Sequence, residues 1–204
     1  MLNVSPEKFL KVPTPHTWVE AAANQEDLLL VDHAHCERKA ASSALSLIYR
    51  HAGRADFCTR LSRIVREEMR HFEQVLVLME SRGHQFRPLS PSRYAKSLHT
   101  FVRNLPGESN SDLFIVAAII EARSCERFRC LLDVLAPQVA DLYVRLCDSE
   151  ARHFLSYLEM AEEVADQQDV SSRTMSLLME ETRLVTEEDA QFRFHSGPPS
   201  ISKH

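Results

Sequence analysis

Two five-residue stretches decide the fold of this chain: Glu-Met-Arg-His-Phe at residues 68–72 and Glu-Ala-Arg-His-Phe at residues 150–154. Each contains the pattern Glu-x-x-His, which places a carboxylate and an imidazole one turn apart on one face of a helix. About one such pattern is expected by chance in a chain of this composition, but two copies that also share Arg and Phe are improbable. The repeat indicates a degenerate duplication, with one helical hairpin in each copy.

Both stretches lie within long amphipathic helices. The first falls in a helix over about 56–82, and the second in a helix over about 137–165 that Pro137 opens. A partner helix precedes each of them, over about 24–51 and about 110–136. Short turns join the helices of each pair, whereas a long connection joins the pairs. This order predicts a ferritin-like four-helix bundle, built from two antiparallel hairpins with a long crossover.

Length and composition favour the same all-α class. The 204 residues are 44% hydrophobic and 26% charged, which suits one substantial core. Four glycines and nine prolines are few for a β-sandwich or barrel. We therefore expect a single domain over residues 1–194 and a disordered tail over residues 195–204. Short flanking helices are expected over about 14–23, which Thr14 and Pro15 open, and over 93–102, and an acidic helix with a solvated face over about 172–190.

Cysteine usage and the distribution of apolar residues indicate a cytoplasmic protein. The five cysteines include no Cys-x-x-Cys pair and are interpreted as reduced thiols. The first residues contain no apolar segment of the kind found in signal peptides. The longest apolar run, residues 113–120, is too short to span a bilayer. We expect a cytoplasmic location and no membrane partner.

The two motifs place their Glu and His side chains in the apolar stripes of the helices. A buried carboxylate costs several kcal/mol unless it is paired or bound to a metal. Each hairpin should supply one more carboxylate from its first helix, and Glu37 and Glu121 lie in the stripes there. Glu121 is about as far before its turn as Glu150 and His153 are after it. Glu126 lies about a turn and a half short of that level and is expected to be solvated.

Four Glu and two His side chains are thus expected to converge, which is the ligand set of di-iron carboxylate proteins. They are Glu37, Glu68, His71, Glu121, Glu150 and His153. Hard carboxylates with two imidazoles suit iron or manganese better than a structural zinc site. A metal-free buried network is the less economical alternative, because four carboxylates would repel one another and take up protons. His33, one turn before Glu37, is left outside the predicted ligand set.

Five longer strings make a family resemblance specific. They are HCERKAASSAL (35–45), REEMRHFEQV (66–75), SRYAKSL (92–98), IIEARSCERF (119–128) and SEARHF (149–154). With these strings the chain resembles the bacterial tRNA 2-methylthio-isopentenyl-adenosine hydroxylases, the MiaE family. The similarity covers roughly residues 14–165 and includes all six expected ligand positions. The acidic helix that follows is not matched.

The resemblance implies a non-haem di-iron monooxygenase with two iron ions as cofactor and O₂ as co-substrate. The six ligands would be its catalytic residues through the di-iron centre. The implied reaction hydroxylates the isopentenyl side chain of the hypermodified adenosine next to the tRNA anticodon. The implied partners are the tRNA anticodon stem-loop and an external donor of two electrons. Two alternatives remain: another di-iron oxidase or ferroxidase of the ferritin-like class, and a non-enzymatic helical adaptor that binds RNA or protein.

The crossover from Ser81 to Leu105 is basic, although the net charge of the chain is −5. It contains no Asp or Glu, and we predict that its cationic side chains contact tRNA phosphates. These residues are Arg82, Arg87, Arg93, Lys96 and Arg103. The alternative is a solvated loop whose charges only keep it soluble.

Overall fold

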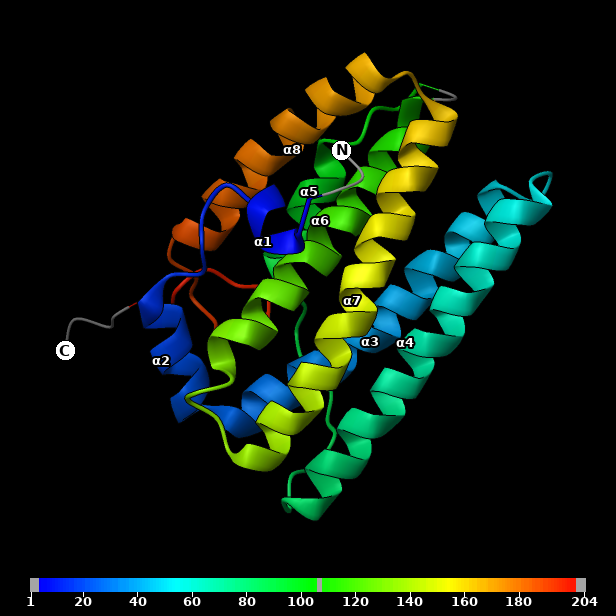
Figure 1. Cartoon of the computed structure of the whole chain (residues 1–204). Coiled ribbons are helices and arrows are strands. Elements are labelled where there is room, and N and C mark those ends of the chain that lie inside the picture. Colours follow the sequence, from blue (N-terminus) through cyan, green and yellow to red (C-terminus); the bar gives the residue numbers. More distant parts are fainter. Residues whose placement is uncertain (1–3, 106–107, 201–204) are drawn as a thin grey trace. The chain divides into compact units, whose positions relative to one another are not determined.

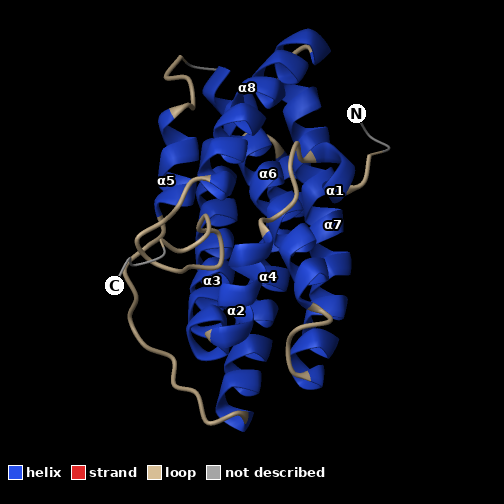
Figure 2. Ribbon diagram, turned by 90° about the vertical axis from the view of Figure 1, so that its left-hand side faces the viewer, coloured by secondary structure: helices blue, strands red, loops and turns tan. Residues whose placement is uncertain are grey.

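The computed structural model describes residues 4–105 and 108–200, without the side chains of residues 108 and 109. Every regular element in these ranges is a helix, which confirms the all-α prediction (Figures 1 and 2). The helices are α1 (Pro6–Phe9), α2 (His16–Asn24), α3 (Glu26–Arg50), α4 (Ala55–Ser81), α5 (Arg93–Thr100), α6 (Glu108–Leu131), α7 (Pro137–Val164) and α8 (Gln167–Thr186). Within the described ranges, no helix combines the length and the hydropathy that a membrane span requires.

The chain forms two compact units. The smaller unit comprises residues 25–90 and consists of the antiparallel pair α3 and α4, joined by a short turn (Figure 1). The apolar stripes of the two helices meet along the pair and bury Leu47, Phe57, Leu61 and Val75. This is the first predicted hairpin. The expectation of a single domain over residues 1–194 stays a prediction.

The larger unit comprises residues 1–24 and 91–204, and α6 lies at its centre. Helix α6 packs along α7 to form the second predicted hairpin, and it also contacts α1, α2, α5 and α8. Because several helices surround it, α6 is buried on more than one face, and even Arg123 and Arg127 have no exposed surface. The single apolar stripe assumed from the sequence therefore understates how much of this helix is covered.

Several predicted helix ends need correction. The acidic helix expected over about 172–190 is α8, which begins at Gln167 and ends at Thr186. Helix α6 ends at Leu131, before the predicted end near residue 136, because the chain turns there and Val134 N and Leu135 N both donate to Leu131 O at 3.2 Å. Thr14 does not cap α2, since its backbone N donates to Glu126 Oε1 at 2.8 Å and its Oγ1 donates to Oε2 at 2.6 Å. The expectation that Glu126 is solvated is therefore wrong as well.

The segment after α8 is ordered by aromatic packing. Phe192 and Phe194 are buried against Trp18 of α2, with ring centroids 5.5 and 6.3 Å from the indole. The guanidinium of Arg127 lies over the Trp18 ring, 4.0 Å from the ring centroid. Trp18 Nε1 donates to Arg193 O at 3.2 Å. These contacts hold the C-terminal segment on the larger unit.

The prediction of a disordered tail from residue 195 is wrong for residues 195–200, while residues 201–204 lie outside the described ranges. His195 is buried, forms a 3.1 Å hydrogen bond with Ser124 Oγ and stacks on Tyr94. Gly197 N donates to Asp189 Oδ2 at 2.8 Å, and a Cβ at position 197 would lie 1.8 Å from Glu187 O. The glycine therefore permits a close approach of two backbones and does not mark a flexible end.

Candidate functional site

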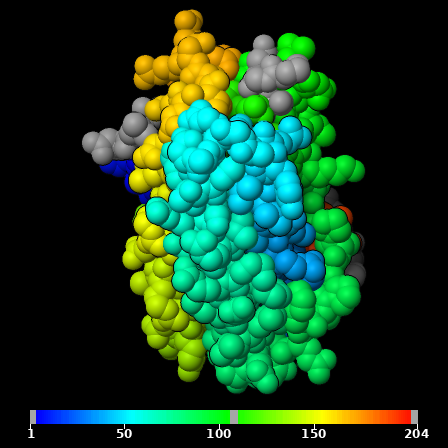
Figure 3. All heavy atoms as spheres, turned by 90° about the vertical axis from the view of Figure 1, so that its right-hand side faces the viewer, coloured from blue at the N-terminus to red at the C-terminus, as the bar shows by residue number. Residues whose placement is uncertain are grey.

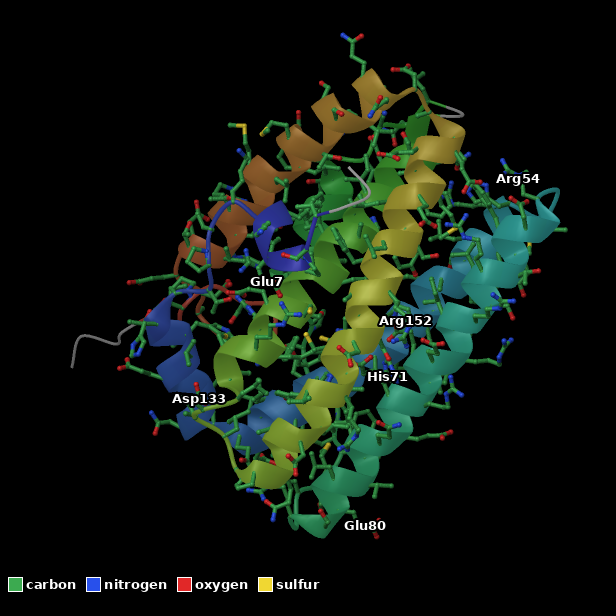
Figure 4. All side chains as sticks on the ribbon, viewed as in Figure 1. Glu7, Arg54, His71, Glu80, Asp133 and Arg152 are labelled. Carbon is green, nitrogen blue, oxygen red and sulfur yellow. The ribbon has the colours of Figure 1, made fainter. Side chains whose placement is uncertain are left out.

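The smaller unit brings three predicted ligands together. Glu37 of α3 and Glu68 and His71 of α4 are buried, and one ligand atom of each lies within 4.8 Å of the others. His71 Nδ1 lies 3.7 Å from Glu37 Oε2 and 3.8 Å from Glu68 Oε2. Figure 4 labels His71 in the middle of α4. The carboxylate of the first helix therefore reaches the Glu-x-x-His pair of the second, and we call this group the first triad.

The larger unit repeats the arrangement with the other three predicted ligands. Glu121 of α6 and Glu150 and His153 of α7 are buried, and one ligand atom of each lies within 4.8 Å of the others. His153 Nδ1 lies 3.8 Å from Glu150 Oε2, the same separation as in the first Glu-x-x-His pair. We call this group the second triad. The duplication seen in the sequence is therefore a duplication of side-chain geometry.

The chemistry and spacing of each triad fit a divalent transition-metal ion. Donor atoms bound to one such ion at about 2.0–2.2 Å lie roughly 3–4 Å from each other. The separations of 3.7–3.8 Å between the imidazole and carboxylate atoms fall in this range and exceed ordinary hydrogen-bond lengths. Two carboxylates and one imidazole are donors that iron and manganese accept readily. Each triad could hold one ion of this type.

Glu126, the glutamate of α6 that the sequence excludes as a ligand, faces different partners. Its carboxylate accepts hydrogen bonds from Thr14 and from Arg123 Nη1, the latter at 2.9 Å. The structure therefore brings Glu121, and not Glu126, to Glu150 and His153.

One supporting residue lies outside the ligand set that the sequence predicts. His33 is buried in α3, and its Nε2 donates to Glu37 Oε1. Metal-binding carboxylates are commonly held by a hydrogen bond of this kind, which fixes their orientation. The spacing of one helical turn between His33 and Glu37 was the only signal of this contact in the sequence.

Replacing His33 by glutamine is expected to lower the affinity of the protein for ferrous iron about 10- to 100-fold, because Glu37 loses the group that orients it. An anaerobic titration with ferrous iron measures this change. His35→Gln is the matched control, since His35 is buried in the same helix but its Nε2 contacts Arg87 O at 2.8 Å. An equal loss in both variants would mean that His33 supports only the helix.

Cys125 and Cys147 tie α6 to α7 one turn from the second triad. Each thiol donates to the backbone oxygen of the other residue, at 3.5 and 3.6 Å. The hydrogen bond with Cys125 lowers the pKa of Cys147 to about 7, and the same contact raises the pKa of Cys125. The pair acts as a small buried link between the two helices.

The arginines inside the two repeated motifs, Arg70 and Arg152, are exposed. Arg152 Nη1 donates to Asp148 O and Nη2 donates to Ser149 Oγ, both at 3.0 Å. Arg70 Nη2 lies 3.9 Å from Glu67 Oε1 on its own helix. These contacts support the helices and involve no residue of either triad.

The positive charge of the crossover, residues 81–105, is largely neutralised by carboxylates from elsewhere in the chain. Four of the five predicted tRNA contacts form ion pairs: Arg82 with Glu26 and Arg87 with Asp27 in the smaller unit, and Arg93 with Asp189 and Arg103 with Asp112 and Asp169 in the larger unit. Lys96 is exposed. The role of these residues in tRNA binding stays a prediction, but the charges of the four arginines are already engaged by carboxylates of the protein.

Comparisons with known proteins give consistent results. Residues 2–196 match the model of the family described as tRNA-(MS[2]IO[6]A)-hydroxylase (MiaE). A relative from Pseudomonas putida, named tRNA 2-(methylsulfanyl)-N(6)-isopentenyladenosine(37) hydroxylase, is 43% identical over 193 residues, which cover 95% of this chain and 94% of the relative. A protein of the same name from Salmonella typhimurium is 32% identical over 94% of this chain and 89% of its own length.

A solved structure with a similar fold is described as protein 43 with aldehyde deformylating oxygenase activity from Synechococcus. It is 35% identical, with a TM-score of 0.90 over 96% of this chain and 99% of that chain. This likeness confirms the ferritin-like fold class. The family match covers both Glu-x-x-His motifs and both triads, and the chain therefore belongs to the tRNA-(MS[2]IO[6]A)-hydroxylase (MiaE) family.

Proposed function

We propose that this chain is a di-iron monooxygenase that hydroxylates the isopentenyl side chain of 2-methylthio-isopentenyl-adenosine next to the anticodon of tRNA. The observation that carries the proposal is the repeated triad of two Glu and one His, found in a chain that belongs to a family of tRNA hydroxylases. The named activity of the relatives supplies the substrate. The cytoplasmic location expected from the sequence agrees with a tRNA substrate.

The six ligands would hold two iron ions, one for each triad. Together the four carboxylates match the four positive charges of two ferrous ions, which removes the repulsion expected among buried carboxylates. When bound, the iron centre supplies the capacity to activate O₂ for attack on a C–H bond. One oxygen atom enters the substrate and the other leaves as water, so two electrons and two protons must come from an external donor.

The remaining contributions come from the residues of the chain itself. Burial of both triads keeps bulk water from the reacting groups. His33 orients Glu37, and the thiols of Cys125 and Cys147 hold α6 against α7 beside the second triad. Rigid helices thus position both Glu-x-x-His pairs, as the precise placement of a metal site requires.

The proposal is tested by iron content and by product analysis. Protein expressed with adequate iron and purified without chelator is expected to contain about two irons per chain. With O₂, a reductant and tRNA that carries the prenylated adenosine, digestion to nucleosides should reveal the hydroxylated nucleoside. Protein that takes up no ferrous iron, or loaded protein that leaves the nucleoside unchanged, would contradict the proposal.

A second candidate is an oxygenase that acts on an aldehyde, and the structural likeness to the Synechococcus protein favours it over a ferroxidase or an adaptor. Incubation of the iron-loaded protein with an aliphatic aldehyde, in parallel with prenylated tRNA, separates the two oxygenase activities. Oxidation of ferrous iron without either product would instead indicate a ferroxidase. A folded protein that binds RNA but no iron would indicate the adaptor.

A further inference from the structure

The turn half of the α3–α4 hairpin carries a strong local excess of positive charge. From Arg38 to Arg66 the chain contains seven Arg or Lys residues and a single acid, Asp56. That acid is already paired with Arg54, at 2.8 Å. We call residues 38–66 the hairpin basic surface. Figure 3 shows the α3–α4 hairpin facing the viewer, with its turn end in cyan. The surface is therefore positively charged, although the chain as a whole has a net charge of −5.

The cations of this surface are available to a partner. Lys39, Arg50 and Arg63 are exposed, and within the described part of the chain they have no carboxylate partner. Arg66 is also exposed, and among the residues that the structure describes its Nη1 donates only to Ser62 Oγ, at 2.9 Å. In the crossover, by contrast, four of the five cations are engaged by acids. Cations without internal partners gain most from phosphate groups, because binding them breaks no existing ion pair.

An exposed aromatic side chain lies next to one of these cations in the sequence. Tyr49 is 77% exposed, immediately before Arg50 on α3. A tyrosine ring left in water is available to stack on an unpaired base, and single-stranded RNA loops present such bases. The combination of cations for the backbone with an aromatic ring for a base is typical of RNA-binding surfaces.

The hairpin basic surface begins at the first triad. Arg38 follows the ligand Glu37 directly, and Arg66 lies two residues before Glu68. From Glu37 to Arg50 a helix rises about 20 Å. An RNA that lies along this surface can therefore make several phosphate contacts while one nucleotide is near the triad.

We propose that the hairpin basic surface binds the phosphate backbone of the tRNA substrate through Lys39, Arg50, Arg63 and Arg66, with Tyr49 stacking on a loop base. This inference rests on the proposed function for the identity of the RNA. It moves the RNA contact from the crossover, where the sequence placed it, to the α3–α4 hairpin.

Binding of a fluorescently labelled tRNA to the full-length protein, measured by anisotropy over a range of salt concentrations, tests the inference without turnover. The variant R50Q/R63Q is compared with R87Q/K96Q, which removes two cations from the crossover. Each lost phosphate contact lowers the log–log salt slope by about 0.7–0.9, so R50Q/R63Q should weaken binding roughly 15- to 30-fold at 0.15 M salt. R87Q/K96Q should bind with nearly the wild-type affinity and slope.

A second variant separates stacking from charge. Y49A is expected to weaken tRNA binding at least about fivefold and to leave the salt slope unchanged, because stacking on a base releases no counterions. Circular dichroism melting of each variant shows whether it is folded, and Tyr49, Arg50 and Arg63 are all exposed.

Equal affinity of R50Q/R63Q and wild type would overturn the inference, and so would a loss confined to R87Q/K96Q. If R50Q/R63Q bound tRNA normally but lost only reductant-driven turnover, the surface would belong to the electron donor and the inference would be wrong. The measurements of tRNA affinity and salt slope do not depend on the reaction. Wild-type protein that binds tRNA through this surface but produces no hydroxylated nucleoside would contradict the proposed function alone.

Discussion

The variant Glu121→Ala is expected to lose metal from the second triad and to lose hydroxylation of prenylated tRNA by more than about 100-fold. Removing only a hydrogen-bond partner of a ligand commonly costs 10- to 100-fold in metal affinity or activity, so removal of a ligand should cost more. Glu121 is buried with Glu150 and His153, and alanine offers no donor atom in its place. Iron per chain and nucleoside analysis after a fixed reaction time measure the two effects.

The matched control is Glu126→Ala in the same helix. Glu126 accepts hydrogen bonds from Thr14 and Arg123, and its loss should lower the thermal stability while the iron stays bound. The two variants thus separate a ligand from a structural carboxylate five residues away on α6. If Glu126→Ala lost iron and Glu121→Ala retained it, the assignment of the ligand in α6 would be wrong.

The variant Glu181→Ala is expected to lower the stability of the protein by about 3–5 kcal/mol, because it leaves a buried guanidinium without its main counter-ion. Arg123 has no exposed surface, and its Nε and Nη2 donate to the two oxygens of Glu181 at 2.7 and 3.1 Å. For a chain of this size, such a loss lowers Tm by roughly 6–20 °C. Scanning calorimetry or a circular dichroism melt measures it.

Tyr94 is the third member of this buried group. Its hydroxyl donates to Glu181 Oε1 at 3.0 Å. Burial, followed by the negative charge of Glu181, raises the pKa of Tyr94, so the phenol stays protonated and remains a donor. In Glu181→Ala this hydroxyl loses its acceptor as well, which adds to the loss of stability.

Two control variants show whether the unpaired buried charge of Arg123 causes the loss of stability in Glu181→Ala. Glu180→Ala removes the neighbouring carboxylate, which pairs with the solvent-screened Arg183, and should lower the stability far less than Glu181→Ala. The double variant Arg123→Met/Glu181→Leu should be more stable than Glu181→Ala, because it removes both charges together. A Glu181→Ala protein as stable as Glu180→Ala would show that the buried pair contributes little.

The repeated motifs made the helices that carry the two triads predictable from sequence. A Glu and a His three residues apart in a helix must share a face, and the apolar residues around them show that this face is covered. From those two facts followed the two hairpins and the choice of Glu37 and Glu121. The structure brings each triad together, α3 with α4 and α6 with α7. Local geometry was sufficient because each triad lies within one antiparallel pair.

The surroundings of α6 were not predictable in the same way. The pattern of residues along the sequence predicts that Glu126 and the acidic face of α8 are exposed to solvent. In the structure, Glu126 and Glu181 both form hydrogen bonds with the buried Arg123. Likewise, the sequence Gly197-Pro198-Pro199 resembles a disordered tail, although Phe192 and Phe194 anchor it on Trp18. Which face of a helix is covered, and by what, depends on segments far apart in the chain.

The sequence by itself determined the helices, their pairing and the chemistry of the six expected ligands, because these depend on helical periodicity and on neighbours one turn apart. Tertiary structure alone decided which charges are neutralised within the protein. In the crossover, Arg93 and Arg103 meet carboxylates about 60 to 100 residues away, whereas Lys39, Arg50 and Arg63 meet none in the described chain. A count of charges along a segment cannot distinguish the two cases, because an ion pair is a matter of distance in space and not of position in the sequence.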